Sequence, residues 1–305
     1  MVLPNGVDDA LNPLAVARVF ETKGRPRFDP LIVHLAPEHD PERWVRLNDT
    51  ARALIEALWP GPLTLLVEKG PEISDLVTSG HPTVALRCPA HPSAQALLRA
   101  FGGPLVAPSA NPFKRISPTS AEAVQEGLGS QLKVILDGGP CEVGLESTIV
   151  NSTAPHPSLP ILRLGGVEPA RLEAMGFQIS YPTPIIGQAP GTLKNHYAPR
   201  KPLYLFEGEL EASQVPADAG VLRWRTALSR PNVELLSEAG SSVEAAARLF
   251  SAMRALDASS APWLIAELPP EEGLGAAIRD RLKRAGSGYF DPDKALSFNP
   301  SSKET

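Results

Sequence analysis

The chain has 305 residues, a length that predicts two domains. Its formal net charge is −5, and its 43% hydrophobic and 21% charged residues are typical of a globular protein. The acidic balance gives no reason to expect non-specific nucleic-acid binding, which usually needs a basic face, although a local basic pocket is still possible. Two cysteines exclude a disulfide framework and a zinc cluster, and the lack of a signal-peptide pattern and of any run of about 18 apolar residues predicts a cytosolic protein with no membrane partner.

Helix and strand patterns alternate along the first 180 residues. A helix should begin at Asn12-Pro13, with Asn as its cap, and end at Gly24. A short buried strand should cover Pro30 to His34, and Asp49 or Thr50 should cap the next helix. Further strands are predicted at 63–68, 83–87, 104–107, 134–136, 148–150 and 161–164, and further helices at 92–101 and 120–128. This alternation predicts an α/β fold with a twisted mixed sheet.

A segment rich in proline and glycine follows, and it should divide the chain. Residues 180–201 show neither helical nor strand periodicity and are interpreted as a linker, yet they carry Lys194, His196 and Tyr197 together. Beyond it, strands are predicted at 203–206, 221–224, 233–236 and 263–267, and helices at 243–256 and 274–285. The predicted domains are therefore 1–179, a linker over 180–201, and a smaller Rossmann-like α/β domain over 202–305 without a GxGxxG motif.

The sequence has no Walker A motif, so a nucleotide would have to be bound by cations at strand and helix ends. The run Lys23-Gly24-Arg25-Pro26-Arg27 closes the first helix and leads into the strand that ends at His34. Lys23 and Arg25 could clamp a phosphate or carboxylate, but cations also complement the negative end of a helix. A single histidine at the end of an apolar strand is more often a core residue than a functional one.

Two arginines stand in apolar strands. Arg87 ends the strand at 83–87 and Arg163 lies within the strand at 161–164. A buried guanidinium is costly unless it is paired, so each must either meet a carboxylate inside the domain or face a ligand in a cleft. Cys88, beside Arg87, is interpreted as a small hydrophobic residue.

Two loops bring hydroxyl and amide groups to strand ends. Ser109 and Asn111 follow one strand and precede Lys114-Arg115 and the helix start, while a glycine-rich loop from Gly138 leads to Ser147. Ligands of α/β sheets bind at such strand ends, near helix N-termini. The alternative is that these side chains only satisfy turn amides or cap the next helix.

In this order, the strings KGRPRFDPLIVH, VALRCPAHP, APSANPFKRISPT, GLESTIVN and ILRLGGV resemble the threonylcarbamoyl-AMP synthase family with its YrdC-like catalytic domain, over roughly residues 6–170. APGTLKNHYAPRKP resembles the linker of the two-domain form, and EGLGAAIRDRLKRAG resembles the end of its C-terminal domain. The resemblance implies that L-threonine, bicarbonate and ATP give L-threonylcarbamoyladenylate, pyrophosphate and water. The product would serve the threonylcarbamoyladenosine modification of tRNA.

The resemblance also implies the roles of single residues. Lys23 and Arg25 would form the catalytic pair at the nucleotide and bicarbonate site, and His196 and Tyr197 would close the linker as a lid. ATP contacts are expected from Arg25, Asp29, Thr83, Asn111, Thr119, Arg163 and Tyr197, and threonine contacts from His34, Arg87, Ser109 and Ser147. Mg²⁺ is expected with the triphosphate but without a protein metal cage. Downstream tRNA-modification proteins are the expected partners, and nothing indicates double-stranded RNA contact.

The start of the chain departs from the family pattern. Members open with a strand and a Pro-Thr-(Asp/Glu)-Thr-Val-Tyr-Gly-Leu segment, whereas Met1–Asn5 stand where that segment should end. If the sequence is complete, we expect weak or no synthase activity and an exposed sheet edge. A catalytically impaired nucleotide- or RNA-binding regulator is then the competing function. Carbamoyl transfer to a protein, as in hydrogenase maturation, is disfavoured by the synthase-type linker and C-terminal domain.

Overall fold

The computed structural model describes residues 2–3, 9–183, 188–191 and 196–293. The chain forms two compact units. The first comprises Met1–Phe113, Ser120–Pro140 and Glu146–Leu193, and the second comprises Lys114–Thr119, Cys141–Leu145 and Lys194–Thr305. Two short segments of the first half of the chain therefore belong to the second unit. Of the predicted linker, 188–191 belong to the first unit, the residues from 196 on belong to the second, and Lys194 lies outside the described residues.

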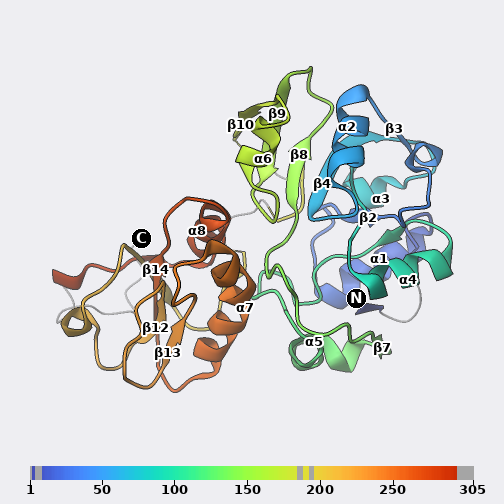
Figure 1. The fold of residues 1–305 in the computed structure, drawn as a ribbon. Coiled ribbons are helices and arrows are strands. Elements are labelled where there is room, and N and C mark those ends of the chain that lie inside the picture. The colour runs from blue at the N-terminus through green and yellow to red at the C-terminus, as the bar shows by residue number, and fades with distance from the viewer. Residues whose placement is uncertain (1, 4–8, 184–187, 192–195, 294–305) are drawn as a thin grey trace. The chain divides into compact units, whose positions relative to one another are not determined.

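The first unit is built on a mixed sheet of eight strands. These are β2 (Ile32–His34), β3 (Val45–Arg46), β4 (Leu63–Lys69), β5 (Thr83–Arg87), β6 (Leu105–Val106), β8 (Thr148–Asn151), β9 (Ser158–Arg163) and β10 (Gln178–Ser180). Their order is β10-β9-β8-β4-β5-β2-β6, with β3 paired to β4 at the side (Figure 1). Parallel pairs such as β2–β5 and β4–β8 alternate with antiparallel pairs such as β4–β5 and β8–β9, which confirms the predicted mixed sheet.

One edge of this sheet is formed by β6. Asp9 makes an isolated antiparallel bridge to Leu105, and both Leu105 and Val106 are fully buried, so this edge is partly covered. A separate two-stranded pair joins β1 (Val2–Leu3) to β7 (Val134–Ile135).

The first unit contains several helices, of which α1 has the caps predicted from the sequence. They are α1 (Pro13–Lys23), α2 (Asp49–Leu58), α3 (Asp75–Thr78), α4 (Pro92–Phe101), α5 (Ala121–Leu128) and α6 (Pro169–Glu173), with 3-10 turns at Pro41–Arg43 and Gly129–Gln131. Asn12 caps α1, and Gly24 ends it with a left-handed φ of 60°. The predicted cap of α2 was wrong by one residue, because Asn48 accepts the N–H of Ala51.

The two faces of this sheet have different neighbours, because side chains alternate along each strand. One face joins a large core that includes Val33, Leu65, Leu86 and Val150 together with residues of the helices. The opposite face carries a small cluster of Leu66, Ala85, Ile149, Leu162 and Ala189, with Ile32 packed against it. This second face, called the small-cluster face below, is covered in part by Ala189 from the predicted linker.

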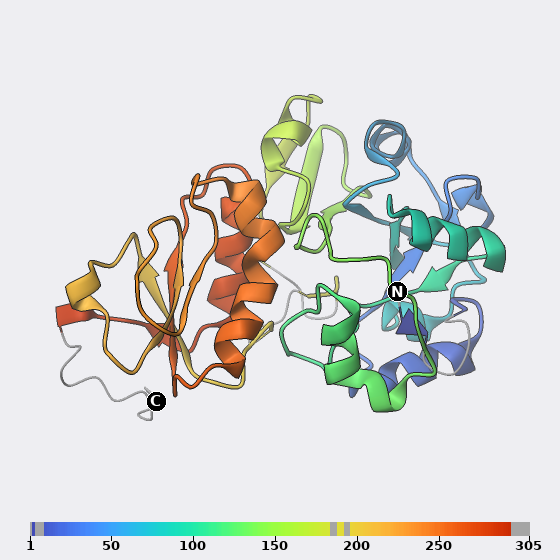
Figure 2. The ribbon, with the colours of Figure 1, turned by 60° about the horizontal axis from the view of Figure 1, so that its bottom comes forward.

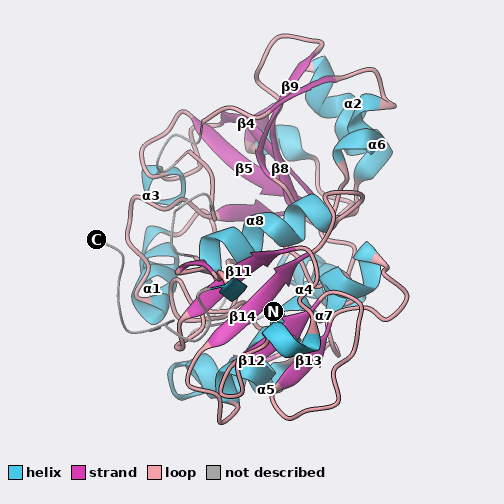
Figure 3. Ribbon diagram, turned by 90° about the vertical axis from the view of Figure 1, so that its left-hand side faces the viewer, coloured by secondary structure: helices cyan, strands magenta, loops and turns pink. Residues whose placement is uncertain are grey.

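The second unit contains a five-stranded sheet in which all strands are parallel. The strands are β11 (Leu203–Glu207), β12 (Gly220–Arg223), β13 (Val233–Leu235), β14 (Leu264–Leu268) and β15 (Gly288–Tyr289), in the order β13-β12-β14-β11-β15. Helices α7 (Ser242–Ala258) and α8 (Gly275–Ala285) lie together on one face of it (Figures 2 and 3). The other face packs against a cluster that includes Leu210, Trp263 and Phe290, and a 3-10 turn lies at Ala212–Gln214.

Two loop segments from the first half of the chain are fixed within the second unit. Ile116 joins the core formed with α7 and α8, and the N–H of Ala198 donates to the carbonyl of Lys114 at 2.9 Å. Gly144 lies so close to α7 that a Cβ there would be 2.1 Å from the carbonyl oxygen of Ala246. These segments were predicted to fall inside the 1–179 span, and the fold attaches them to the second unit instead.

Among the described residues, no helix is long and apolar enough to cross a membrane.

Candidate active site

Three polar side chains lie side by side across the central strands of the first unit. His34 is in register with Arg87 across β2 and β5, and Arg87 is in register with Thr64 across β5 and β4. Residues in register point to the same face of a sheet. Each of the three stands two residues along its strand from a member of the small-cluster face, so the row lies on that face.

Ser147 and Arg163 extend this row. The Ser147 hydroxyl lies 2.7 Å from the Thr64 hydroxyl. The Arg163 guanidinium donates to the Ser147 carbonyl at 2.9 and 3.1 Å and to its hydroxyl at 3.1 Å, and it donates to the carbonyl of Pro190 at 3.1 Å. Arg163 therefore fixes Ser147 and a linker residue, while the contact with ATP stays a prediction.

A second group of charged residues is built around the end of α1. The Lys23 ammonium donates to the carbonyls of Ser109 and Asn111, the latter at 2.5 Å. Arg25 donates to the carbonyls of Asp29 at 3.0 Å and Pro30 at 2.6 Å, and it forms a buried salt bridge with the Asp29 carboxylate at 3.0 Å. Lys23 is thus bound to the loop after β6, so its position is not explained by its own helix end alone.

The two groups occupy opposite ends of the same strands. Pro30 lies two residues before β2, whereas His34 ends it, and four residues of extended chain span about 13 Å. Thr83 begins the parallel strand β5 and shares the face of Arg87, which ends it. We call Lys23, Arg25, Asp29, Thr83, Ser109 and Asn111 the amino-end group, and His34, Thr64, Arg87, Ser147 and Arg163 the carboxyl-end group.

Burial and like charges shift the pKa values of both groups. Burial, together with the nearby Arg25 charge, lowers the pKa of Lys23 to about 7, and burial raises the pKa of Asp29 against the pull of Arg25 and Arg163. Burial and the Arg163 charge lower the pKa of Arg87 to about 10. The Arg163 charge lowers the pKa of both Asp29 and Arg87, so it links the two groups, and we call them together the cationic region. An anionic ligand there would relieve the repulsion, which marks the region as a functional-site candidate.

The first unit therefore brings together most of the residues predicted for ATP and threonine. Thr119, His196 and Tyr197 belong to the second unit. The Tyr197 ring is 1% exposed, stacks on Phe250 with centroids 5.5 Å apart, and lies 5.2 Å below the Arg281 guanidinium. Its φ of 66° costs an L-residue roughly 1–2 kcal/mol, so this packing has to hold it there. Whether these residues close over a ligand stays a prediction.

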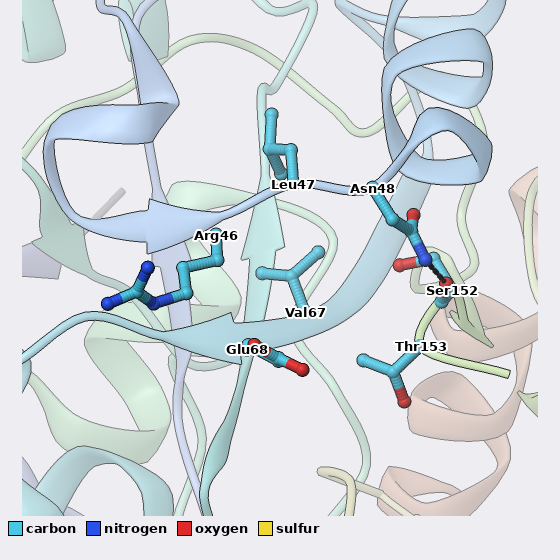
Figure 4. Close-up of a pocket in the computed structure, with 7 residues that line it drawn as sticks. All are labelled: Arg46, Leu47, Asn48, Val67, Glu68, Ser152 and Thr153. Carbon is cyan, nitrogen blue, oxygen red and sulfur yellow. Dashed lines mark hydrogen bonds between the residues drawn. The ribbon is translucent and has the colours of Figure 1, made fainter.

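A cavity of about 130 Å³ lies at the other end of β4, away from Thr64 (Figure 4). It is lined by Arg46, Leu47, Asn48, Val67, Glu68, Ser152 and Thr153. The Asn48 amide donates to the Ser152 carbonyl at 2.7 Å, as Figure 4 shows, so that amide already has a partner in the protein. None of the predicted site residues that the structure describes lines this cavity, although Thr83 is in register with Glu68.

Sequence reasoning missed two contributors, Thr64 and Pro190. Thr64 is a hydroxyl residue inside the buried strand Leu63–Lys69. Because a buried polar group needs a hydrogen-bond partner, its position in an apolar strand could have indicated a polar neighbour. Pro190 contributes a backbone carbonyl to Arg163. Every residue has such a carbonyl, so this contact could not be predicted from the residue type.

The pKa of His34 predicts how stability depends on pH. Burial and the Arg87 charge lower this pKa from 6.5 to about 3 in the folded state. Between these values the unfolded chain binds a proton that the folded chain does not, so the free energy of unfolding falls as the pH drops from 6.5 toward 3, by about 1.4 kcal/mol per pH unit. The free energy of unfolding of His34→Gln, measured by urea denaturation at a series of pH values, should therefore fall less steeply with decreasing pH in that window. Above pH 7.5 its pH dependence should equal that of wild type. Equal slopes throughout would contradict the prediction.

Both units match known families. A family model described as "Telomere recombination", built on Sua5, YciO and YrdC proteins, matches residues 7–165, and one described as "Threonylcarbamoyl-AMP synthase, C-terminal domain" matches residues 167–287. The fold and the cationic region thus define a protein with a YrdC-like first unit and a second unit of the synthase type. The chain belongs to the threonylcarbamoyl-AMP synthase family.

Individual relatives agree over nearly the whole chain. The threonylcarbamoyl-AMP synthase of Bacillus subtilis is 36% identical over 92% of this chain and 86% of its own length, and that of Pyrococcus abyssi is 34% identical with the same coverage. The crystal structure of P. abyssi Sua5 complexed with L-threonine has a TM-score of 0.83, 31% identity, and covers 91% of this chain and 86% of its own.

Proposed function

We propose that the chain is an L-threonylcarbamoyladenylate synthase, which converts L-threonine, bicarbonate and ATP to threonylcarbamoyl-AMP, pyrophosphate and water. The observation that carries the proposal is the cationic region, in which Lys23, Arg25, Arg87 and Arg163 come from distant segments to one part of one unit. A triphosphate and an amino-acid carboxylate are the ligands that such a region would accept. The relatives named above carry this activity in their names.

The carboxyl-end group is the proposed threonine site. Arg87 is cationic and, among the described residues, makes its side-chain hydrogen bond to the carbonyl of Gly61 at 3.1 Å through Nε. Its remaining N–H groups suit a bidentate contact with a carboxylate. Ser147 adds a hydroxyl, and the Nδ1 atom of His34 is buried and finds no hydrogen-bond partner among the described residues, so it is available to a polar ligand atom.

The amino-end group is the proposed site of the phosphates and of bicarbonate. The threonine amine attacks the bicarbonate carbon, giving a carbamate and water. A carbamate oxygen then attacks the α-phosphorus, and the bond to the β-phosphate oxygen breaks as pyrophosphate leaves. Negative charge moves onto the departing oxygen, and Lys23 and Arg25 would stabilise it. Both cations are held by backbone carbonyls, so they need little reorganisation when the charge develops.

The linker is proposed to shield the mixed anhydride from water. In support, Ala189 is buried in the small-cluster face and Pro190 accepts from Arg163 beside Ser147. His196 and Tyr197 would complete the lid, as the family resemblance implies.

Mg²⁺ is proposed to enter with ATP. No group of three or more His, Cys, Asp or Glu side chains that could hold a metal occurs in the described ranges, and Asp29 is engaged by Arg25. The triphosphate oxygens would therefore supply most of the ligands. The ion would neutralise phosphate charge, while the protein would orient the triphosphate.

An assay of pyrophosphate release tests the proposal. Release should require both L-threonine and bicarbonate, and it should be lost in Arg25→Ala. ATP binding without threonine-dependent release would instead favour the nucleotide- or RNA-binding regulator. The product would pass to tRNA-modification proteins in the cytosol.

A further inference from the structure

Thr64 is a buried residue whose hydroxyl has a single hydrogen-bond partner among the residues that the structure describes. Its relative exposure is 0%, and its hydroxyl lies 2.7 Å from that of Ser147, which is 1% exposed. It stands in register with Arg87 on one side and Ile149 on the other, in the middle of the central sheet. No role follows for it from the family resemblance.

The hydrogen bonds around Ser147 determine what its hydroxyl can offer. A serine hydroxyl has one donor and two acceptor positions. Arg163 fills one acceptor position at 3.1 Å and also fixes the Ser147 carbonyl with two further bonds. The remaining acceptor position and the proton depend on the direction of the bond with Thr64.

The surroundings of Thr64 decide that direction. Among the described residues, its hydroxyl has no hydrogen-bond partner other than Ser147, so its proton must go to Ser147 or remain unsatisfied in the interior. If Thr64 donates, both acceptor positions of Ser147 are filled by Thr64 and Arg163. The Ser147 proton is then free to be given to an anionic acceptor near Arg87.

We propose that Thr64 is a positioning residue that turns the Ser147 hydroxyl into a hydrogen-bond donor for the carboxylate of the amino-acid substrate. Thr64 acts through Ser147 and touches no reacting atom. The inference rests on the proposed threonine site, and it adds that the carboxylate is bound jointly by the Arg87 cation and an oriented hydroxyl.

The test compares Thr64→Val, which keeps the shape and removes the hydroxyl, with Thr64→Ser, which keeps the hydroxyl. Thr64→Val should weaken L-threonine binding about 10- to 100-fold, the range of a hydrogen bond to a charged group, in calorimetric titration with L-threonine. Its KM for ATP should stay within about twofold of wild type, and Thr64→Ser should restore threonine affinity to within about threefold.

Ser152→Ala is the matched control, because the Ser152 hydroxyl is also buried and bonds across β8 and β4, to the carbonyl of Leu66 at 2.8 Å. It should lower the thermal midpoint and leave threonine binding unchanged. Unchanged threonine affinity in Thr64→Val, or an equal loss of ATP and threonine affinity, would overturn the role of Thr64.

The titration also separates this inference from the proposed function. If wild type binds L-threonine but releases no pyrophosphate, the synthase assignment fails while a selective loss in Thr64→Val still supports the positioning role. If wild type does not bind L-threonine, both the synthase assignment and the positioning role of Thr64 are contradicted.

Discussion

Arg87→Met should strongly reduce threonine-dependent pyrophosphate release and raise the thermal midpoint of the protein. Arg87 makes one protein hydrogen bond in the described structure, to the carbonyl of Gly61, and its charge is opposed by burial and by Arg163. If Arg87 binds the substrate carboxylate as proposed, the folded protein keeps a costly buried cation for binding, as strained functional sites do, although Glu146 offsets part of that cost. Loss of a charged, bidentate contact should lower kcat/KM for threonine by about 10²- to 10³-fold.

The control is Arg99→Met on helix α4. Arg99 also carries a guanidinium, but it is exposed and bonds to Glu38 at 2.8 Å. An exposed pair contributes at most about 1 kcal/mol, so activity should be unchanged and the midpoint should change little. A fall in the midpoint of Arg87→Met would show that Arg87 is a structural cation, and retained activity would remove it from the threonine site.

Periodicity and capping residues specified most of the fold. The strand at 83–87 and the helix at 92–101 match the structure at both ends, because the apolar pattern, His91-Pro92 and Gly102 define them locally. The strands β10 and β15 were not predicted, since each has only two or three residues and is stabilised by its neighbours in the sheet. The position of Lys114–Thr119 in the second unit was also not predictable, because it depends on tertiary contacts alone.

The sequence could indicate the candidate site only at the level of residue types and strand ends. A cation or hydroxyl at a strand end indicated Arg87 and Ser147, whereas His34 was assigned only by the family resemblance; register and a hydrogen bond then place these residues near one another on one face. The division into two groups at opposite ends of β2 and β5 was not predictable, because it depends on which strands are parallel neighbours. Nor could any pattern indicate that Lys23 is held by two backbone carbonyls.

Gly165→Ala should disrupt the same site through the backbone. A Cβ at Gly165 would lie 2.3 Å from the carbonyl oxygen of Glu146, 2.4 Å from the carbonyl carbon of Ser147 and 2.5 Å from the nitrogen of Thr148. These are backbone atoms, and Gly166 already bonds to the Glu146 carbonyl at 3.0 Å, so the segment around Ser147 must move as a whole. We expect the free energy of unfolding, measured by urea denaturation, to fall by about 3 kcal/mol, the upper range for overpacking.

Gly127→Ala is the matched control, and its effect should have the opposite sign. Gly127 lies inside α5, and its added Cβ would meet the Cδ atom of Pro112 at 3.4 Å, an ordinary contact. Gly127 is the penultimate residue of this helix, so replacing it should stabilise the fold by roughly 0.5 kcal/mol, the lower end of the range for a helical glycine, and leave threonine affinity unchanged. Because Gly165→Ala displaces Ser147, its loss of threonine affinity should persist at 10 °C, where the variant remains folded. Normal affinity of the folded variant would show that the close approach at Gly165 serves stability and does not position Ser147.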